Sequence, residues 1–219
     1  MAESRWESQN ILIAVNFSVR SVLSVVNCLE QVPGTHMISM ESETGEETET
    51  LVQLAGERTA NFFDAHRLCC SESVIVMLNR GFGGGLPTEA ALQLGAGFCQ
   101  GMGGAGCSCG ALSGGVAGLG VFLGPHGPDG LRKKKFQGIV REMHDRFRER
   151  FHATCCRVLS KKVKHDEKAH RANCLLLTRG GAEIAVRLLL QARPDLIEKA
   201  DRNFLAARDG LRPAGEVAG

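Results

Sequence analysis

The stretch Cys109-Gly110-Ala111-Leu112-Ser113-Gly114-Gly115 says more about this chain than any other part of its sequence. Small and apolar residues continue from it to Leu123, so it predicts a glycine-rich helix with a cysteine at the N-terminus. The first N–H groups of a helix are unpaired and form the positive end of its dipole. We therefore expect a lowered pKa for Cys109 and a thiol suited to redox or metal chemistry.

Three glycines of this helix, Gly110, Gly114 and Gly118, are spaced four residues apart and share one face. A face without side chains permits close approach by an inorganic cluster or by the backbone of another helix. The sequence leaves both interpretations open.

Outward from this helix, apolar residues recur at three- and four-residue steps, as they do in amphipathic helices. Such helices are predicted at residues 51–62, 136–151 and 174–191. Residues 71–78 are predicted to be a short apolar helix or the continuation of 51–62, and Pro87 is expected to start another helix over 88–92. Asn173 is the candidate cap of the last helix, and the glycine-rich residues 95–106 are predicted to be a loop. No alternating strand pattern of useful length occurs. The predicted class is all-α, a compact helical bundle with a Gly-rich central helix and loop.

These patterns divide the chain into three parts. Residues 1–50 form an N-terminal extension that ends in an acidic run, 41–49, which we expect to be solvated chain. Residues 51–192 form a cysteine-rich helical redox domain. Residues 193–219 form a flexible tail whose Gly- and Pro-containing end should fray.

The N-terminal extension shows no targeting signal. Met1–Asn10 carries acids where a signal peptide has bases, and polar residues interrupt the apolar stretch Ile11–Leu29. The stretch is also too interrupted to span a membrane. The stretch is apolar on most sides and must therefore be buried. Two explanations of the stretch remain. Either it is a docking segment, or residues 1–39 are not native and were translated upstream of the true start. We favour the second.

The composition excludes several classes of protein. A net charge of +2 gives no case for a nucleic-acid partner, and 23% charged residues beside 43% apolar residues exclude wholesale disorder. Nine cysteines in 219 residues are too few for a secreted disulfide scaffold, and their number is odd. We expect a cytoplasmic protein, in which cysteines more often bind metals or take part in catalysis.

Most of the cysteines occur in clusters. Cys69-Cys70 and Cys155-Cys156 are vicinal pairs, and Cys107-Ser108-Cys109 is a C-x-C sequence. All three clusters fall at predicted junctions between helix and loop, where packing does not require a thiol. The isolated Cys28 and Cys99 are expected to be small buried hydrophobic residues.

Four of these cysteines resemble those of a known family, the redox-active proteins named for four spaced cysteines and a Cys-Gly-Ala-x-x-Gly motif. Cys109–Gly114 is similar to the central motif at every fixed position. Cys70-Ser71-Glu72-Ser73-Val74 resembles the first family cysteine and its helix, with Glu where the family often has Gln. Cys156-Arg157-Val158-Leu159 and Cys174 resemble the third and fourth elements. The resemblance covers roughly Leu51 to Ala192.

The resemblance implies one redox site made by four cysteines: Cys70, Cys109, Cys156 and Cys174. Four thiolates can hold an iron–sulfur cluster, or they can cycle through disulfides with Cys109 and Cys174 as the redox-active thiols. We favour the cluster slightly, because four cysteines from four elements suit a cage and a dithiol centre needs only two. The neighbouring cysteines are secondary candidates: Cys69, Cys107 and Cys155. A redox partner protein is expected, and a homodimer that shares the site is compatible with the sequence.

Other functions have weaker support. Zinc would need ligands from a set that contains no C-x₂-C pair: Cys156, His165, His170 and Cys174. Gly101–Gly106 fits G-x-G-x-x-G, but no strand precedes it, so no nucleotide is expected. Covalent haem is not expected, because the chain has no Cys-x-x-Cys-His. The rival class is a non-enzymatic interaction module in which the cysteines only pack.

Overall fold

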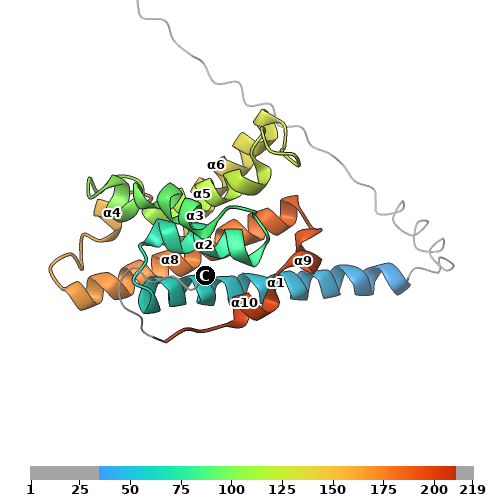
Figure 1. The fold of residues 1–219 in the computed structure, drawn as a ribbon, viewed down its shortest axis with the longest axis horizontal. Helices are drawn as coiled ribbons and strands as arrows, with labels where there is room; N and C mark the ends of the chain where they lie inside the picture. Colours follow the sequence, from blue (N-terminus) through green and yellow to red (C-terminus); the bar gives the residue numbers. More distant parts are fainter. Residues whose placement is uncertain (1–34, 211–219) are drawn as a thin grey trace, which may run out of the picture. The chain divides into compact units, whose positions relative to one another are not determined.

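The computed structural model describes residues 35–210, and the side chains among them from residue 45 onward. The described part is helical, with no strand beyond a single isolated bridge (Figure 1). The expected all-α class is therefore confirmed. No described helix is long and apolar enough to cross a membrane. The stretch Ile11–Leu29 lies outside the described residues.

The chain divides into two units, residues 1–40 and residues 41–219. The acidic run 41–49, expected to be solvated chain, lies within the helix α1 (Thr35–Ala65); its described side chains, from residue 45 on, are exposed or half-buried. Glutamate is a good helix former. Two of the acids also form ion pairs with distant arginines: Glu47 with Arg202 and Glu49 with Arg187. These pairs involve residues far along the chain and leave no local pattern in the sequence.

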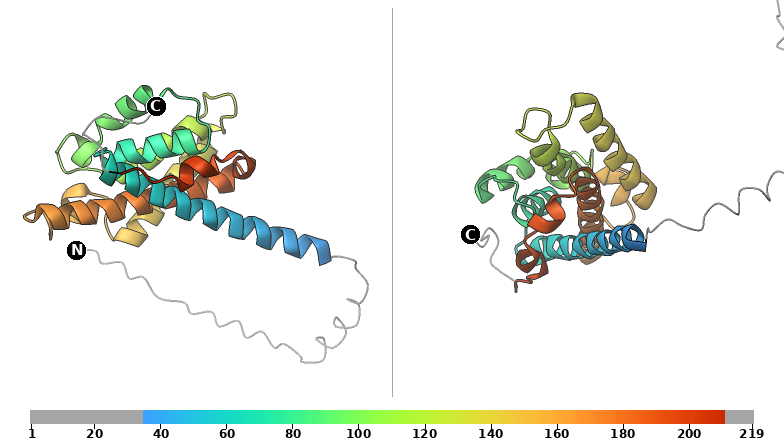
Figure 2. Two further views of the ribbon diagram at one scale, coloured as in Figure 1. Left: turned by 60° about the horizontal axis from the view of Figure 1, so that its bottom comes forward. Right: turned by 90° about the vertical axis from the view of Figure 1, so that its right-hand side faces the viewer.

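The centre of the second unit consists of α2 (Cys70–Gly81), α5 (Gly110–Leu123) and α8 (Glu167–Ala192), which pack on one another (Figures 1 and 2). Two further helices contact this centre: α3 (Thr88–Ala96) and α6 (Lys133–Phe151). The five residues Val74–Leu78 of α2 have no exposed surface at all. A helix buried on every side is held by packing, so α2 is a rigid base for the residues at its N-terminus.

Glycines let the central helices approach closely. A Cβ at Gly114 of α5 would lie 2.8 Å from the Cα of Ser71 in α2. A Cβ at Gly181 of α8 would lie 3.0 Å from the backbone oxygen of Ala111 in α5. The neighbours in both places are backbone atoms, which cannot move aside as a side chain can. The N-terminal ends of α2 and α5 are thus fixed beside each other.

The last long helix starts earlier than its sequence pattern predicts. Its expected range was 174–191 with Asn173 as the cap, whereas α8 begins at Glu167. The cap is Asp166, whose carboxylate accepts a hydrogen bond of 2.9 Å from the backbone N–H of Ala169. Polar residues at the start of the helix hide its periodicity. As a result, Cys174 lies inside α8 and not at its beginning.

The segment after α8 packs back on the domain. It contains two short helices, α9 (Leu196–Lys199) and α10 (Arg202–Ala206), and Leu205 is fully buried. Beyond them, the carboxylate of Asp209 lies 2.8 Å from the buried guanidinium of Arg58 in α1. Up to residue 210, this part of the predicted tail therefore belongs to the folded unit.

Candidate functional site

A cavity of about 600 Å³ lies where several helices begin, and four free cysteines line it. Cys70 is the first residue of α2, Cys109 is the N-cap of α5, and Cys156 is the first residue of α7 (Cys156–Leu159). Cys174 comes from the third turn of α8. The structure thus brings together the four cysteines that the sequence assigned to one site. We call this space the cysteine cavity.

Backbone pairing places Cys109 next to Cys156. The N–H of Cys109 donates to the carbonyl oxygen of Thr154 at 2.8 Å, and the N–H of Cys156 donates to that of Cys107 at 2.6 Å. Ser108 and Cys155 form the isolated antiparallel bridge between these segments. So short a pairing has no alternating pattern, and this is why sequence reasoning missed it.

The glycine-rich loop before Cys107 closes over the same region. A Cβ at Gly101 would lie 2.6 Å from the Cβ of Cys156, and Gly101 has a φ of +71°. The contact and the backbone conformation both require glycine there. Gln100 beside it also has a positive φ, 52°, and lines the cavity. The loop is thus shaped to pack on the start of α7.

Gly110 makes room for the thiol of Cys70. A Cβ at Gly110 would overlap the Sγ of Cys70 and would lie 3.0 Å from the carbonyl oxygen of Phe98. The other two glycines of this face contact α2 itself: Gly114 the backbone of Ser71, and Gly118 the side chain of Leu78. Gly114 and Gly118 therefore serve helix packing, whereas Gly110 makes room for a sulfur.

The expected low pKa of Cys109 is wrong. Burial, with smaller contributions from the nearby thiols of Cys70 and Cys156, raises its pKa to about 12. Hydrogen bonds from the backbone N–H groups of Ala111 and Leu112 act in the opposite direction, as the helix N-terminus predicts, but they are outweighed. Only 4% of Cys109 is exposed. The sequence shows the helix end but not the depth of its burial.

The other cavity thiols are shifted in the same direction. Burial raises the pKa of Cys174 to about 11, with further contributions from Cys70 and Cys156. Burial is also the main reason why the pKa values of Cys70 and Cys156 are raised. Each ionised thiol would therefore be both desolvated and repelled by its neighbours. Without a bound cation, the protonated forms are favoured at neutral pH.

In two of the three cysteine clusters, the structure places one thiol in the cavity and its neighbour outside it. Cys107 is exposed, and the thiol of Cys155 donates to the carbonyl oxygen of Gly106 at 2.9 Å. Neither lines the cavity, whereas their neighbours Cys109 and Cys156 do. Each of these two clusters therefore provides an internal comparison between a thiol inside the cavity and one outside it.

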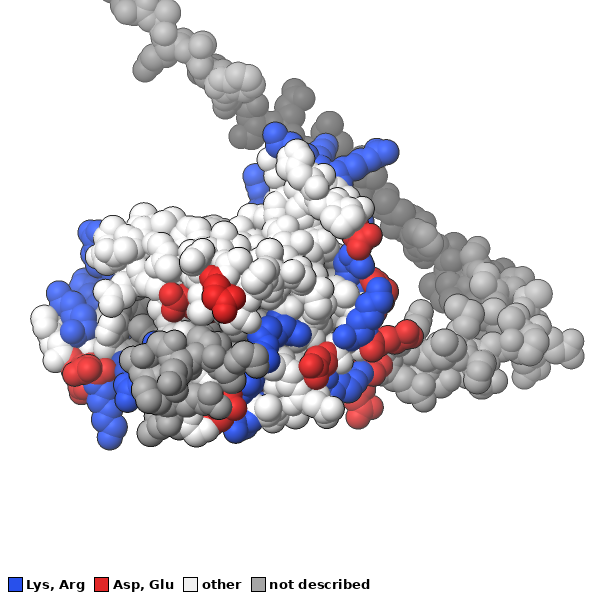
Figure 3. All heavy atoms as spheres, in the orientation of Figure 1, with Lys and Arg blue, Asp and Glu red and all other residues white. Residues whose placement is uncertain are grey.

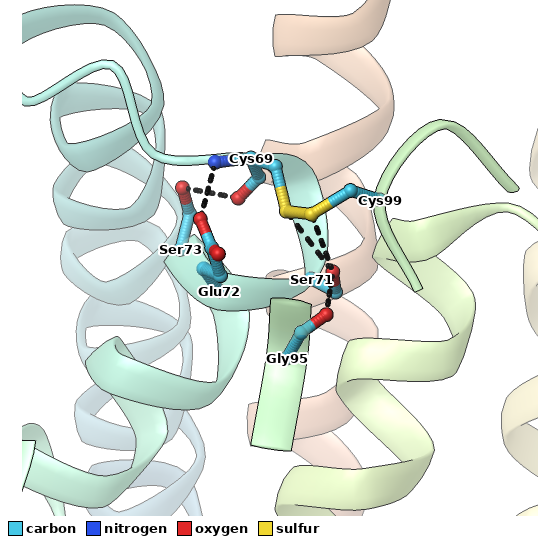
Figure 4. Close-up of a disulfide and its surroundings, with 6 residues drawn as sticks. All are labelled: Cys69, Ser71, Glu72, Ser73, Gly95 and Cys99. Atoms are coloured by element: carbon cyan, nitrogen blue, oxygen red, sulfur yellow. Dashed lines mark hydrogen bonds between the residues drawn. A yellow bond between two sulfur atoms is a disulfide. The ribbon is translucent and has the colours of Figure 1, made fainter. Parts of the chain in front are cut away.

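Cys69 and Cys99 form a disulfide with a Cα–Cα distance of 5.7 Å (Figure 4). The expectation that Cys99 only fills space in the core is therefore wrong, while Cys28 lies outside the described residues. Cys69 also lines the cavity, next to Cys70. The pairing joins the start of α2 to α4 (Cys99–Met102). The two cysteines are 30 residues apart, and no feature of the sequence signals that they pair.

A single zinc ion does not match the spacing of the cavity thiols. Tetrahedral zinc with Zn–S bonds of about 2.3 Å places its sulfur ligands about 3.8 Å apart. Among the described residues, only Cys69, Glu72 and Cys99 form a set of three or more potential ligand atoms within 4.8 Å of one another. His170 does line the cavity. Nevertheless, the zinc ligands considered from the sequence do not gather this closely: Cys156, His165, His170 and Cys174.

Basic residues border the cavity. One carboxylate, that of Glu167, lines it together with four basic side chains: Arg67, Arg157, His170 and Arg171. Arg171 is partly neutralised by Asp64, at 3.1 Å. Figure 3 shows Lys and Arg side chains, with some Asp and Glu among them, at the left-hand end of the molecule, where α8 begins in Figure 1. Such a border favours anions and negatively charged centres near the thiols.

Comparison with known proteins identifies the family of the chain. Residues 68–188 match the family model described as "Putative redox-active protein (C_GCAxxG_C_C)". No curated protein and no solved structure matches the chain. The matched range covers more than half of the 219 residues and includes all four free cysteines of the cavity. The protein therefore belongs to this family.

Proposed function

We propose that this protein transfers electrons and that the four thiols of the cysteine cavity hold an iron–sulfur cluster. The observation that carries the proposal is the convergence of four thiols, from α2, α5, α7 and α8, on one cavity. Four cysteine thiolates are the common ligand set of such clusters, and the bound cluster supplies one-electron transfer.

The pKa values support a cluster over a metal-free dithiol. Burial raises the pKa of Cys109 to about 12 and that of Cys174 to about 11. A thiol that stays protonated at neutral pH is a weak nucleophile and is not suited to disulfide exchange. Metal binding instead takes the proton from a coordinating thiol. These two thiols are therefore better suited to ligation than to nucleophilic attack.

The spacing supports a group larger than one ion. In the described part of the chain, no three of the cavity sulfurs lie within 4.8 Å of one another, as ligands of one zinc ion would. The cavity volume of about 600 Å³ also exceeds what a single ion needs. Both observations favour a polynuclear centre.

Protein groups around the thiols would set the properties of the bound centre. The backbone N–H groups of Ala111 and Leu112 are directed at the sulfur of Cys109. Hydrogen bonds to the sulfurs, together with burial, are the means by which proteins tune cluster potentials. The buried thiol of Cys109 is kept from bulk water, and the basic border offsets negative charge on the thiolates.

A second candidate function is thiol–disulfide exchange, and the Cys69–Cys99 disulfide supports it. This disulfide adjoins Cys70, so a disulfide and a free thiol lie next to each other at the cavity. Both cysteines of the disulfide are half-buried and not fully enclosed. In this function the disulfide would accept two electrons and two protons from a dithiol partner.

The test is anaerobic purification, followed by iron, sulfide and zinc analysis and a visible absorption spectrum. The cluster proposal expects iron and acid-labile sulfide in similar amounts, and loss of both in Cys109→Ala and Cys156→Ala. The matched controls are Cys107→Ala and Cys155→Ala, which remove the neighbouring thiols outside the cavity. These two variants should retain the iron.

Two results would overturn the cluster proposal. One is a metal-free protein even under anaerobic conditions, in which case exchange by the Cys69–Cys99 disulfide becomes the leading function. The other is equal iron loss from cavity variants and their matched controls. Full retention of fold and partner binding without metal or thiol reactivity would favour an interaction module with packed cysteines.

A further inference from the structure

The two sulfurs of the disulfide and one carboxylate lie close enough together to become metal ligands once the disulfide is reduced. The sulfurs of Cys69 and Cys99 and a carboxylate oxygen of Glu72 all lie within 4.8 Å of one another. Figure 4 shows the carboxylate of Glu72 in the turn of α2 that follows Cys69. No other described residues meet this criterion. We call this set the Cys69–Glu72–Cys99 triad.

The local structure positions each member of the triad. Glu72 accepts a hydrogen bond of 2.9 Å from the backbone N–H of Cys69, which directs its carboxylate back toward the start of α2. A carboxylate has two oxygens, so the second remains able to bind a cation. A Cβ at Gly95 would lie 2.9 Å from the Cα of Glu72, which shows how closely α3 packs beside the triad.

Ser71 faces both sulfurs without blocking them. Its hydroxyl lies 3.3 Å from the Sγ of Cys69 and 3.8 Å from that of Cys99. The same hydroxyl donates its proton to the carbonyl oxygen of Gly95 at 2.8 Å. The oxygen lone pairs can therefore face the sulfurs, as they would face two thiols after reduction (Figure 4).

We propose that reduction of the Cys69–Cys99 disulfide creates a zinc site in this triad. A dithiol gives two electrons and two protons to the disulfide, leaving two cysteine thiols and an oxidised dithiol. Zn²⁺ then binds both sulfurs and Glu72 and releases the two thiol protons. A peroxide reverses the change: the two thiolates become the disulfide, the peroxide and two protons become two waters, and Zn²⁺ leaves.

The ligand chemistry favours zinc. Two thiolates and one carboxylate are ligand types that Zn²⁺ accepts, and three protein ligands leave a fourth position for water. Two thiolate charges and one carboxylate charge also outweigh the charge of the cation, which favours strong binding. All three residues are half-buried, so both the reductant and the ion can reach them.

This site adjoins the cysteine cavity, which Cys69 also lines, but its ligands differ from those of the proposed cluster. The cluster needs the free thiols of the cysteine cavity, whereas zinc needs the two cysteines of the disulfide and Glu72. Iron and sulfide analysis tests the first, and the redox dependence of zinc binding tests the second. Failure of either proposal is therefore distinguishable from failure of the other.

The experiment measures zinc per chain in the full-length protein, oxidised and reduced, by competition with a chromophoric chelator. A phosphine serves as the reductant, because dithiols themselves bind zinc; with one water it becomes the phosphine oxide as the disulfide becomes two thiols. Peptide mass mapping confirms the state of the Cys69–Cys99 bond. We expect each chain to bind one additional Zn²⁺ ion tightly after reduction and to release this ion when peroxide is added.

Variants assign the additional ion. Cys99→Ala should show no increase in zinc on reduction, and Glu72→Gln should weaken the additional site at least about tenfold. Glu72→Gln retains an acceptor for the N–H of Cys69, so it remains informative if Cys99→Ala does not fold. Cys107→Ala is the matched control and should show the full increase. Equal zinc in both redox states of the unmodified protein, or an increase that persists in Cys99→Ala, would overturn the proposal.

Discussion

The Sγ of Cys70 rests against the backbone of Gly110, at the place where any other residue would carry its Cβ. The first residue of α2 and the first turn of α5 therefore meet with only a sulfur atom between them. Gly110 directly follows Cys109, so the central motif supplies one thiol and the space for a second. This explains in physical terms why a glycine belongs beside that cysteine.

Alanine substitutions should distinguish Gly110, which makes room for a sulfur of the cysteine cavity, from Gly114, which packs against the backbone of α2. Gly110→Ala overlaps only a side-chain sulfur, which can rotate away, and approaches the carbonyl oxygen of Phe98 to 3.0 Å, so we expect a loss of about 1 kcal/mol in the free energy of unfolding. Gly114→Ala meets the backbone of Ser71 at 2.8 Å and should cost about 3 kcal/mol. Urea unfolding measures both losses.

Gly138→Ala is the control for these two variants. Gly138 lies in α6, and no atom lies within 4 Å of the position that a Cβ would take there. Alanine should therefore stabilise the helix by about 0.5–1 kcal/mol. A stability gain in Gly110→Ala equal to that in Gly138→Ala would contradict the close contact between Gly110 and Cys70.

The reactivity of the two cysteines in the C-x-C sequence should differ strongly in metal-free, reduced protein. Cys107 is exposed, whereas burial raises the pKa of Cys109 to about 12. Alkylation near neutral pH should therefore label Cys107 well before Cys109, as read by peptide mass spectrometry. Labelling of Cys109 as fast as Cys107 would mean that the helix N-terminus outweighs burial after all.

The raised pKa of Cys109 also makes the metal-free protein less stable at alkaline pH. Below about pH 9 the thiol is protonated in both states; between about 9 and about 12 it ionises first in the unfolded chain. The free energy of unfolding therefore falls as pH rises through this range, by at most about 1.4 kcal/mol per pH unit for this thiol. Urea unfolding of Cys109→Ala should show a flatter pH dependence.

Leu119→Ala is the control for this pH effect. Leu119 is fully buried in α5 but does not ionise, so its truncation should lower stability by about 3 kcal/mol at every pH. The slope against pH should remain that of the unmodified protein. If Cys109→Ala and Leu119→Ala change the slope equally, the thiol is not the group responsible.

Local patterns predicted much of the helical framework. Apolar spacing and the glycine-rich composition identified α5 (Gly110–Leu123) with its actual bounds, and the stripe at 136–151 identified most of α6. The four cysteines of the cavity were selected from their motifs and a family resemblance. In these cases the information lies within a few residues of the feature itself.

Several errors arose where distant parts of the chain meet. The helix α1 continues through the acidic run, where Glu49 pairs with Arg187, far along the chain. The disulfide of Cys99 and the high pKa of Cys109 likewise depend on residues that become neighbours only in the folded state. No local periodicity encodes such contacts.

The segment after α10 should contribute to stability through Asp209. Its carboxylate lies 2.8 Å from both the guanidinium of Arg58 and the Nε2 of His66, and Arg58 is only 3% exposed. Asp209→Ala leaves a buried cation without this partner, so we expect the free energy of unfolding to fall by about 2 kcal/mol. That value is below the usual loss for a fully buried pair, because the Asp209 side chain is 21% exposed.

Asp129→Ala is the control: it removes the exposed partner of Arg193 and should cost less than about 0.5 kcal/mol in the free energy of unfolding. Equal losses in the two variants, measured by urea unfolding, would show that residues up to 210 do not hold α1 in place.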